Sequence, residues 1–92
     1  MKYLVFYESP PELDRAKIEE HVAAHRARWA EFRDQGTLLA IGPMEDPHDG
    51  ALAVFTTREA AEEFVAGDPF VLHQVVIGHR VTGWNEVLLE PR

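Results

Sequence analysis

A long amphipathic run between short apolar segments constrains the fold of this chain more than any other feature. Residues 12–35 carry charges around a narrow apolar stripe that recurs with the period of an α-helix. The stripe consists of Ile18, Val22, His25, Trp29 and Phe32. Gly36 follows where a left-handed residue commonly ends a helix. The run is therefore predicted to form one helix whose apolar side lies on a sheet.

Segments rich in β-branched and aromatic residues flank this helix and are typical of strands. The predicted strands are 2–8, 37–44, 51–57 and 75–89. Asp49-Gly50 favours a tight reversal, so the second and third strands are expected to form a hairpin. Gly78 and Gly83 are candidate bends or bulges in the last strand.

A second, shorter helix is predicted after the third strand. Thr56 or Thr57 would cap it, with Glu59 placed for a capping box behind Thr56. It would end at Gly67, and the DPFVLHQ segment that follows would be a turn or a short helical piece. Its inward residues are expected to be Ala60, Ala61, Phe64 and Val65. The order βαββαβ over 1–92 predicts one α+β domain with a four-stranded antiparallel sheet.

Two of the strands are apolar on both sides, although two helices cover only one face of a sheet. In the first strand, Leu4 and Phe6 would oppose Tyr3, Val5 and Tyr7. In the second, Leu38 and Ala40 would oppose Leu39 and Ile41. We therefore expect a homodimer in which two sheets pack face to face as a barrel.

Composition and charge argue against several classes of partner and exclude any chemistry that needs a thiol. The net charge of −7 argues against nucleic acid, and Arg26, Arg28 and Arg33 are expected to form only a solvated helix face. The chain has no cysteine, which excludes disulfides, thiolate nucleophiles and zinc-thiolate sites. No apolar run reaches the ~20 residues that span a bilayer. With no signal-peptide pattern at the start, a cytoplasmic location without membrane contact is expected.

His25 interrupts the apolar stripe near its centre. One interpretation is a core histidine whose ring nitrogens are hydrogen-bonded, since an unpartnered buried imidazole is costly. The other is that the helix lines a cavity and presents His25 there for proton transfer near neutral pH. Asp68 has two compatible interpretations as well: an N-cap followed by Pro69, or a carboxylate that orients an imidazole.

Other residues carry weaker signals. His21 and His25 have metal-ligand spacing, but the glutamate of an HExxH motif and a third ligand are missing, so no metal or cofactor is predicted. Gly42-Pro43 is either a strand end or a tight bend that brings N–H groups to a cavity. Trp29 and Trp84 are more often core or interface anchors than substrate platforms.

The order and spacing of several short motifs resemble the YCII-related domain family over nearly the whole chain. The matching elements are His25-xxx-Trp29, Gly36-x-Leu38, Gly42-Pro43, Ala60-Ala61-xx-Phe64, Asp68-Pro69-Phe70 and Trp84. The resemblance implies a ferredoxin-like fold that pairs as a dimeric α/β barrel, with His25 and Asp68 as an active-site pair. Barrel relatives include isomerases and lyases of small cyclic or chlorinated aromatic-derived compounds. His21 replaces a more usual apolar or proline-containing approach to the histidine.

These observations together predict a cofactor-independent enzyme that isomerises a small organic molecule or eliminates a group from it. His25 would be the general acid/base and Asp68 would orient it. The residues expected to contact the ligand are Gly42, Pro43, Trp29 and Phe70, with N–H groups near Gly42 steadying an oxyanion. The alternative is a non-catalytic small-molecule-binding or dimerisation module, and a metal enzyme that uses His21 and His25 is a third possibility.

Overall fold

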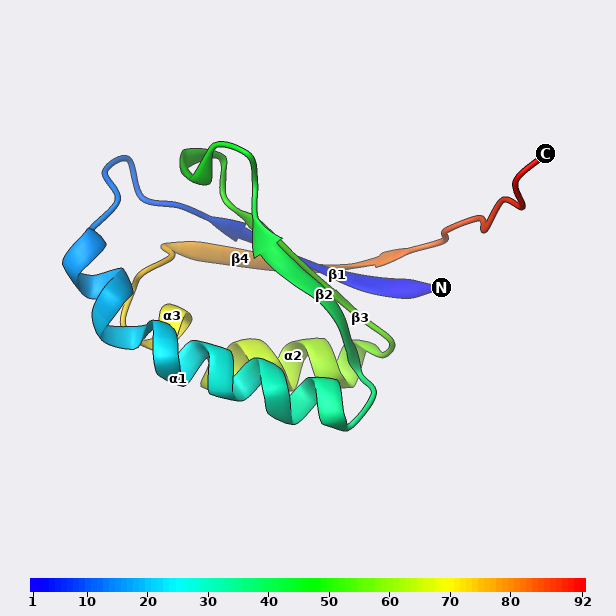
Figure 1. Ribbon diagram of the computed structural model, residues 1–92, viewed down its shortest axis with the longest axis horizontal. Helices are drawn as coiled ribbons and strands as arrows, with labels where there is room; N and C mark the ends of the chain where they lie inside the picture. Colours follow the sequence, from blue (N-terminus) through cyan, green and yellow to red (C-terminus); the bar gives the residue numbers. More distant parts are fainter.

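Residues 1–92 form a four-stranded antiparallel sheet with its helices on one face, as the computed structural model shows (Figure 1). The strand order is β2-β3-β1-β4. The strands are β1 (Lys2–Glu8), β2 (Leu38–Pro43), β3 (Ala51–Phe55) and β4 (Gly78–Trp84). The helices are α1 (Arg15–Asp34), α2 (Arg58–Gly67) and the short α3 (Pro69–Leu72), with a 3₁₀ turn η1 at Pro47–Asp49. The predicted α+β ferredoxin-like fold and its hairpin of β2 and β3 are confirmed.

Capping residues set the ends of the two main helices. The Asp14 side chain accepts a hydrogen bond from the Lys17 N–H, so α1 begins at Arg15, later than predicted. Gly36 adopts a φ of +78° just after the helix, as expected of a C-terminal cap. In α2, Thr57 is the cap and accepts from the Ala60 N–H. Of the two predicted caps, Thr57 is therefore confirmed, and the predicted capping box of Thr56 with Glu59 is wrong by one residue.

A bulge in β2 changes which side chains share a face. Leu38 is opposite Phe55, but Ala40 is already opposite Val54, so Leu39 is the extra residue. Leu38 is buried and Ile41 packs against the core, whereas Leu39 and Ala40 are exposed. The predicted opposition of Leu38 and Ala40 to Leu39 and Ile41 was wrong, because strict alternation fails across a bulge.

The last strand is shorter than predicted. β4 ends at Trp84, and its register with β1 runs without a shift from Lys2–Trp84 to Glu8–Gly78. Gly78 and Gly83 therefore lie in regular pairing and make no bulge. Residues 75–77 precede the strand, and residues 85–92 leave the sheet as an irregular tail (Figure 1).

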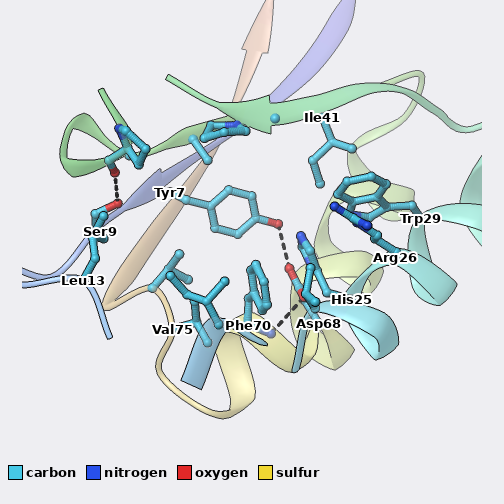
Figure 2. A pocket seen from close by; sticks show the side chains of 18 of the residues that line it. Tyr7, Ser9, Leu13, His25, Arg26, Trp29, Ile41, Asp68, Phe70 and Val75 are labelled. Carbon is cyan, nitrogen blue, oxygen red and sulfur yellow. Dashed lines mark hydrogen bonds and ion pairs between the residues drawn. The ribbon is translucent and has the colours of Figure 1, made fainter. Parts of the chain in front are cut away.

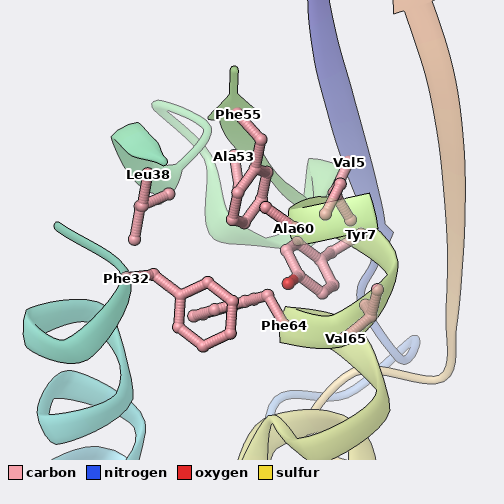
Figure 3. Close-up of a cluster of buried hydrophobic side chains, with 10 residues drawn as sticks. Val5, Tyr7, Phe32, Leu38, Ala53, Phe55, Ala60, Phe64 and Val65 are labelled. Atoms are coloured by element: carbon pink, nitrogen blue, oxygen red, sulfur yellow. The ribbon is translucent and has the colours of Figure 1, made fainter. Parts of the chain in front are cut away.

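The dry part of the core lies between α2, the C-terminal half of α1 and the sheet (Figure 3). Phe32 and Phe64 meet edge to face with ring centroids 5.1 Å apart, and Phe55 lies 5.3 Å from Phe64. Ala60, Ala61, Phe64 and Val65 are all buried, as predicted for α2. No helix in the chain has the length and apolar character required of a membrane span.

Candidate active site

A cavity of about 400 Å³ lies between α1, as far along as Trp29, the sheet and α3 (Figure 2). Its apolar lining comprises Leu13, Ile18, Val22, Trp29, Ile41, Phe70, Val75 and Val76. The Ser9 hydroxyl donates to the Pro47 carbonyl over 2.6 Å, which ties the segment after β1 to η1 beside the cavity (Figure 2). The space is large enough for a small organic molecule.

His25 and Asp68 meet in the wall of this cavity, although 43 residues separate them in the sequence. The Nδ1 atom of His25 and the Oδ1 atom of Asp68 are 2.6 Å apart. The Asp68 side chain is fully buried, and His25 is only 7% exposed. A contact this short in a buried setting is a charge-assisted hydrogen bond when the carboxyl is ionised.

Asp68 reaches His25 because it also begins α3. Its Oδ1 accepts the Phe70 N–H over 3.0 Å, and Pro69 occupies the first helical position. The cap fixes the carboxylate at the junction of α2 and α3, directly across from α1. The two interpretations of Asp68 as a cap and as a partner of an imidazole therefore both describe its geometry.

Tyr7 completes the cluster and was missed by the sequence analysis. Its hydroxyl donates to Oδ2 of Asp68 over 3.3 Å, from a strand position that faces the helices (Figure 2). Burial raises the pKa of the Tyr7 phenol well above its ordinary value, and the negative charge of Asp68 raises it further. The phenol thus remains a neutral donor. The signal in the sequence was its inward place in β1, two residues after Val5.

The imidazole of His25 is held by aromatic rings as well. The Phe70 ring stacks on it with centroids 3.8 Å apart and planes 12° from parallel, and Trp29 approaches edge-on at 5.2 Å. The Nε2 atom of His25 has no hydrogen-bond partner within the chain. When Asp68 accepts the Nδ1 proton, Nε2 carries the lone pair and can take a proton from a molecule in the cavity.

Each predicted ligand-contacting residue borders the same cavity. Gly42, Pro43, Trp29 and Phe70 all belong to its lining. Gly42 and Pro43 are the last residues of β2 and pair with β3, so they form a strand end and not a tight bend. Their contact with a ligand stays a prediction.

His21 lies outside the cavity lining, although it precedes His25 by one helical turn. Its ring stacks on His73 with centroids 3.9 Å apart and planes 6° from parallel. Across the chain, no three His, Asp or Glu side chains gather in a way that suits a metal ion.

Three different environments surround the α1 arginines that were predicted to form a solvated face. Arg33 pairs with the adjacent Asp34 on the surface, as expected of a solvated face. Arg28 is wrongly predicted, because it is half-buried and donates to the carbonyls of Phe64 and Glu63 at the end of α2. Arg28 thereby holds the end of α2 against α1, close to Asp68. Arg26 borders the cavity.

Comparison with protein families and with solved structures shows which proteins this chain is similar to. Residues 1–85 match the YCII-related domain. No curated protein matches the sequence significantly. Among solved structures, 5-chloro-2-hydroxyhydroquinone dehydrochlorinase (TftG) from Burkholderia phenoliruptrix, in complex with 2,5-dihydroxybenzoquinone, is similar with a TM-score of 0.73. It is 21% identical, and the similarity covers 95% of this chain and 96% of that chain. A variant of SnoaB, a cofactor-independent oxygenase from Streptomyces nogalater, has a TM-score of 0.50 and 18% identity, with 97% and 96% covered.

Proposed function

Since the chain belongs to the YCII-related domain family, we propose that it is a small-molecule enzyme that moves a proton with His25 and Asp68. The reaction would be an isomerisation or an elimination that needs no cofactor. One observation carries this proposal: Nδ1 of His25 lies 2.6 Å from Asp68 at the cavity wall, while Nε2 has no partner in the chain. The similar dehydrochlorinase supports an elimination.

The proposed step begins when Nε2 of His25 takes a proton from a carbon or oxygen of the bound molecule. The imidazolium that forms is stabilised by the Asp68 carboxylate, which accepts the Nδ1–H and keeps the ring in place. Return of the proton to another atom gives an isomer, whereas departure of a leaving group gives an elimination. A positioned acid/base of this kind contributes about 10²–10⁴ in rate.

Chloride release from 5-chloro-2-hydroxyhydroquinone tests the proposal with a compound named for a similar protein. His25→Gln should lower the rate by about 10²–10⁴. His48→Gln is a matched control, because His48 also contacts an aspartate, Asp46, at 2.9 Å but lies on the exposed η1 turn. Equal rates in the native protein and His25→Gln would contradict the assignment of His25.

A non-catalytic binding module is the alternative, and ligand affinity separates it from the enzyme. His25→Leu should cost about 1–3 kcal/mol of stability in either case, because the buried Asp68 carboxylate loses a hydrogen-bond partner. If the pair of His25 and Asp68 has only a structural role, 2,5-dihydroxybenzoquinone should bind unchanged in this variant. An enzyme whose His25 contacts the ligand should lose affinity for 2,5-dihydroxybenzoquinone in the same variant. A matched titration of the native protein supplies the reference.

A second copy of the chain is the proposed partner of the outer sheet face. Leu39 is 51% exposed there, and Leu4, Phe6, Leu52 and Val54 are half-buried with no helix over them. An apolar sheet face of this kind is stabilised when it is covered. Sedimentation of the native protein should give a dimer, and Leu52→Glu should give a monomer. A native monomer at micromolar concentration would contradict the pairing.

A further inference from the structure

The cavity has a charge balance opposite to that of the whole chain. The protein carries 16 acidic and 9 basic side chains, yet Asp68 is the one carboxylate that borders the cavity. Its oxygens already accept from Tyr7, His25 and the Phe70 N–H. The remaining charged groups of the lining are the guanidinium groups of Arg15 and Arg26. Two guanidinium groups against one carboxylate give the lining a net positive charge.

Neither of these arginines has a carboxylate partner, unlike Arg33, which pairs with Asp34. Arg26 lies against the Trp29 ring with 5.9 Å between the guanidinium carbon and the ring centroid. Figure 2 shows Arg26 and Trp29 together on the side of the cavity that also carries His25. Arg26 is thus exposed to solvent where it borders the cavity, and the chain uses none of its hydrogen-bond donors.

The helix period accounts for this placement. Arg26 follows Val22 by four residues and precedes Trp29 by three, so all three lie along one face of α1. His25 precedes Trp29 by four residues, so His25 and Arg26 flank the line from Val22 to Trp29, and both border the cavity. A ligand group bound by Arg26 would therefore lie beside the imidazole, while the rest of the ligand would occupy the apolar space of the cavity.

We infer that the ligand of this cavity is a small organic anion whose carboxylate or enolate oxygen binds Arg26 and whose apolar ring or chain packs against the lining. A guanidinium presents paired donors that suit such an oxygen anion. The buried indole N–H of Trp29, which has no acceptor in the chain, belongs to the same wall. This inference rests on the proposed function and names the substrate class of the same site.

Benzoate and benzamide form a matched pair of probes, because they share size and shape but differ in charge. Their affinities can be measured by NMR titration, with the Trp29 indole signal assigned in a Trp84→Phe background. We expect benzoate to bind at least about tenfold more tightly than benzamide, a difference of about 1.4 kcal/mol. Arg26→Gln should remove this preference by weakening benzoate alone. The control Arg33→Gln removes the same charge from the same helix outside the cavity.

The outcomes separate this inference from the function on which it rests. Equal binding of the two probes at Trp29, or equal losses in Arg26→Gln and Arg33→Gln, would overturn the anionic ligand while leaving the cavity a binding site. If neither probe shifts the Trp29 signal, the anionic ligand class is overturned, whereas the proposed function is contradicted only by chloride release that does not depend on His25. Loss of benzoate binding in Arg26→Gln alone supports the inference, and wild-type-like unfolding of that variant shows that the fold is intact.

Discussion

The two halves of α1 contact the same sheet in opposite ways. At the C-terminal half, Phe32 packs edge to face against the rings of Phe55 and Phe64 in an apolar cluster (Figure 3). From its N-terminus as far as Trp29, α1 borders a cavity, and His25 at the middle of the helix joins Tyr7 and Asp68 in a polar cluster (Figure 2). The apolar stripe of α1 thus packs into a filled hydrophobic core at one end and borders a cavity with a polar cluster at the other.

The difference arises from what faces α1 and not from α1 itself. Beside Phe32, α2 supplies the buried apolar side chains of Phe64 and Val65, with Ala60 and Ala61 allowing close approach to the sheet. Beside His25, α2 has ended at Gly67, and the chain turns into α3 with Asp68 at the junction. The break brings a capping carboxylate inward and leaves volume unfilled. We therefore expect stability to be concentrated at the filled end, while the proposed binding and proton transfer would have room at the broken end.

Asp68 is the hydrogen-bond acceptor that Tyr7, His25 and the Phe70 N–H share. Its removal should destabilise the polar half of the layer, the end that carries this cluster and the cavity, more than any other single substitution there. Asp68→Ala removes the cap of α3 and leaves the Tyr7 hydroxyl and His25 Nδ1–H without an acceptor. A lost cap costs ~1 kcal/mol, and each of the two unsatisfied buried groups costs ~1–3 kcal/mol, so a loss of at least about 3 kcal/mol is expected. Chemical denaturation measures it.

Asp68→Asn is the matched variant, since it keeps an acceptor oxygen and the shape of the side chain. It should cost less than half as much stability as Asp68→Ala and still abolish the acid–base role, because an amide does not balance an imidazolium. Equal losses in the two variants would show that charge, not the acceptor geometry, stabilises the polar half.

The polar half should also respond to alkaline pH in a way that the dry half does not. The folded Tyr7 phenol keeps its proton well above the ordinary pKa of 10.0, so the unfolded chain releases that proton first. Stability attributable to Tyr7 is therefore complete below pH 10 and declines as the pH rises further, by up to about 1.4 kcal/mol per pH unit.

Tyr7→Phe should flatten this decline when free energies of unfolding are compared at pH 9 and pH 11. Phe64→Leu, a change in the dry half, should lower stability at both values by the same amount. An unchanged slope in Tyr7→Phe would contradict the assignment of a buried neutral phenol.

The sequence predicted the apolar core around Phe64 better than the polar cluster of His25 and Asp68, for a physical reason. Periodicity identifies which side of an element is buried, which was enough to place Phe64 and Val65 in the core. It does not identify contacts between residues far apart in the chain. The meeting of His25 with Asp68 followed from a family resemblance, and Tyr7 resembled any inward strand residue. The bulge at Leu39 depends on local hydrogen bonding that no alternation pattern records.

The smallest expected difference in stability tests the comparison of the two ends of α1 most directly. It comes from one substitution, valine to alanine, made once in the filled core and once at the cavity. Val65 is 3% exposed in the filled core, whereas Val22 of α1 borders the cavity. Val65→Ala opens a new void and should cost about 2 kcal/mol, while Val22→Ala only enlarges an existing hollow and should cost under about 1 kcal/mol. In contrast, only Val22→Ala should change the affinity for benzoate, because its methyl groups line the proposed binding space. If the two variants lose equal stability, the N-terminal half of the layer is as tightly packed as the C-terminal half. The space beside His25 would then be closed in solution, and a small-molecule ligand would have no room there.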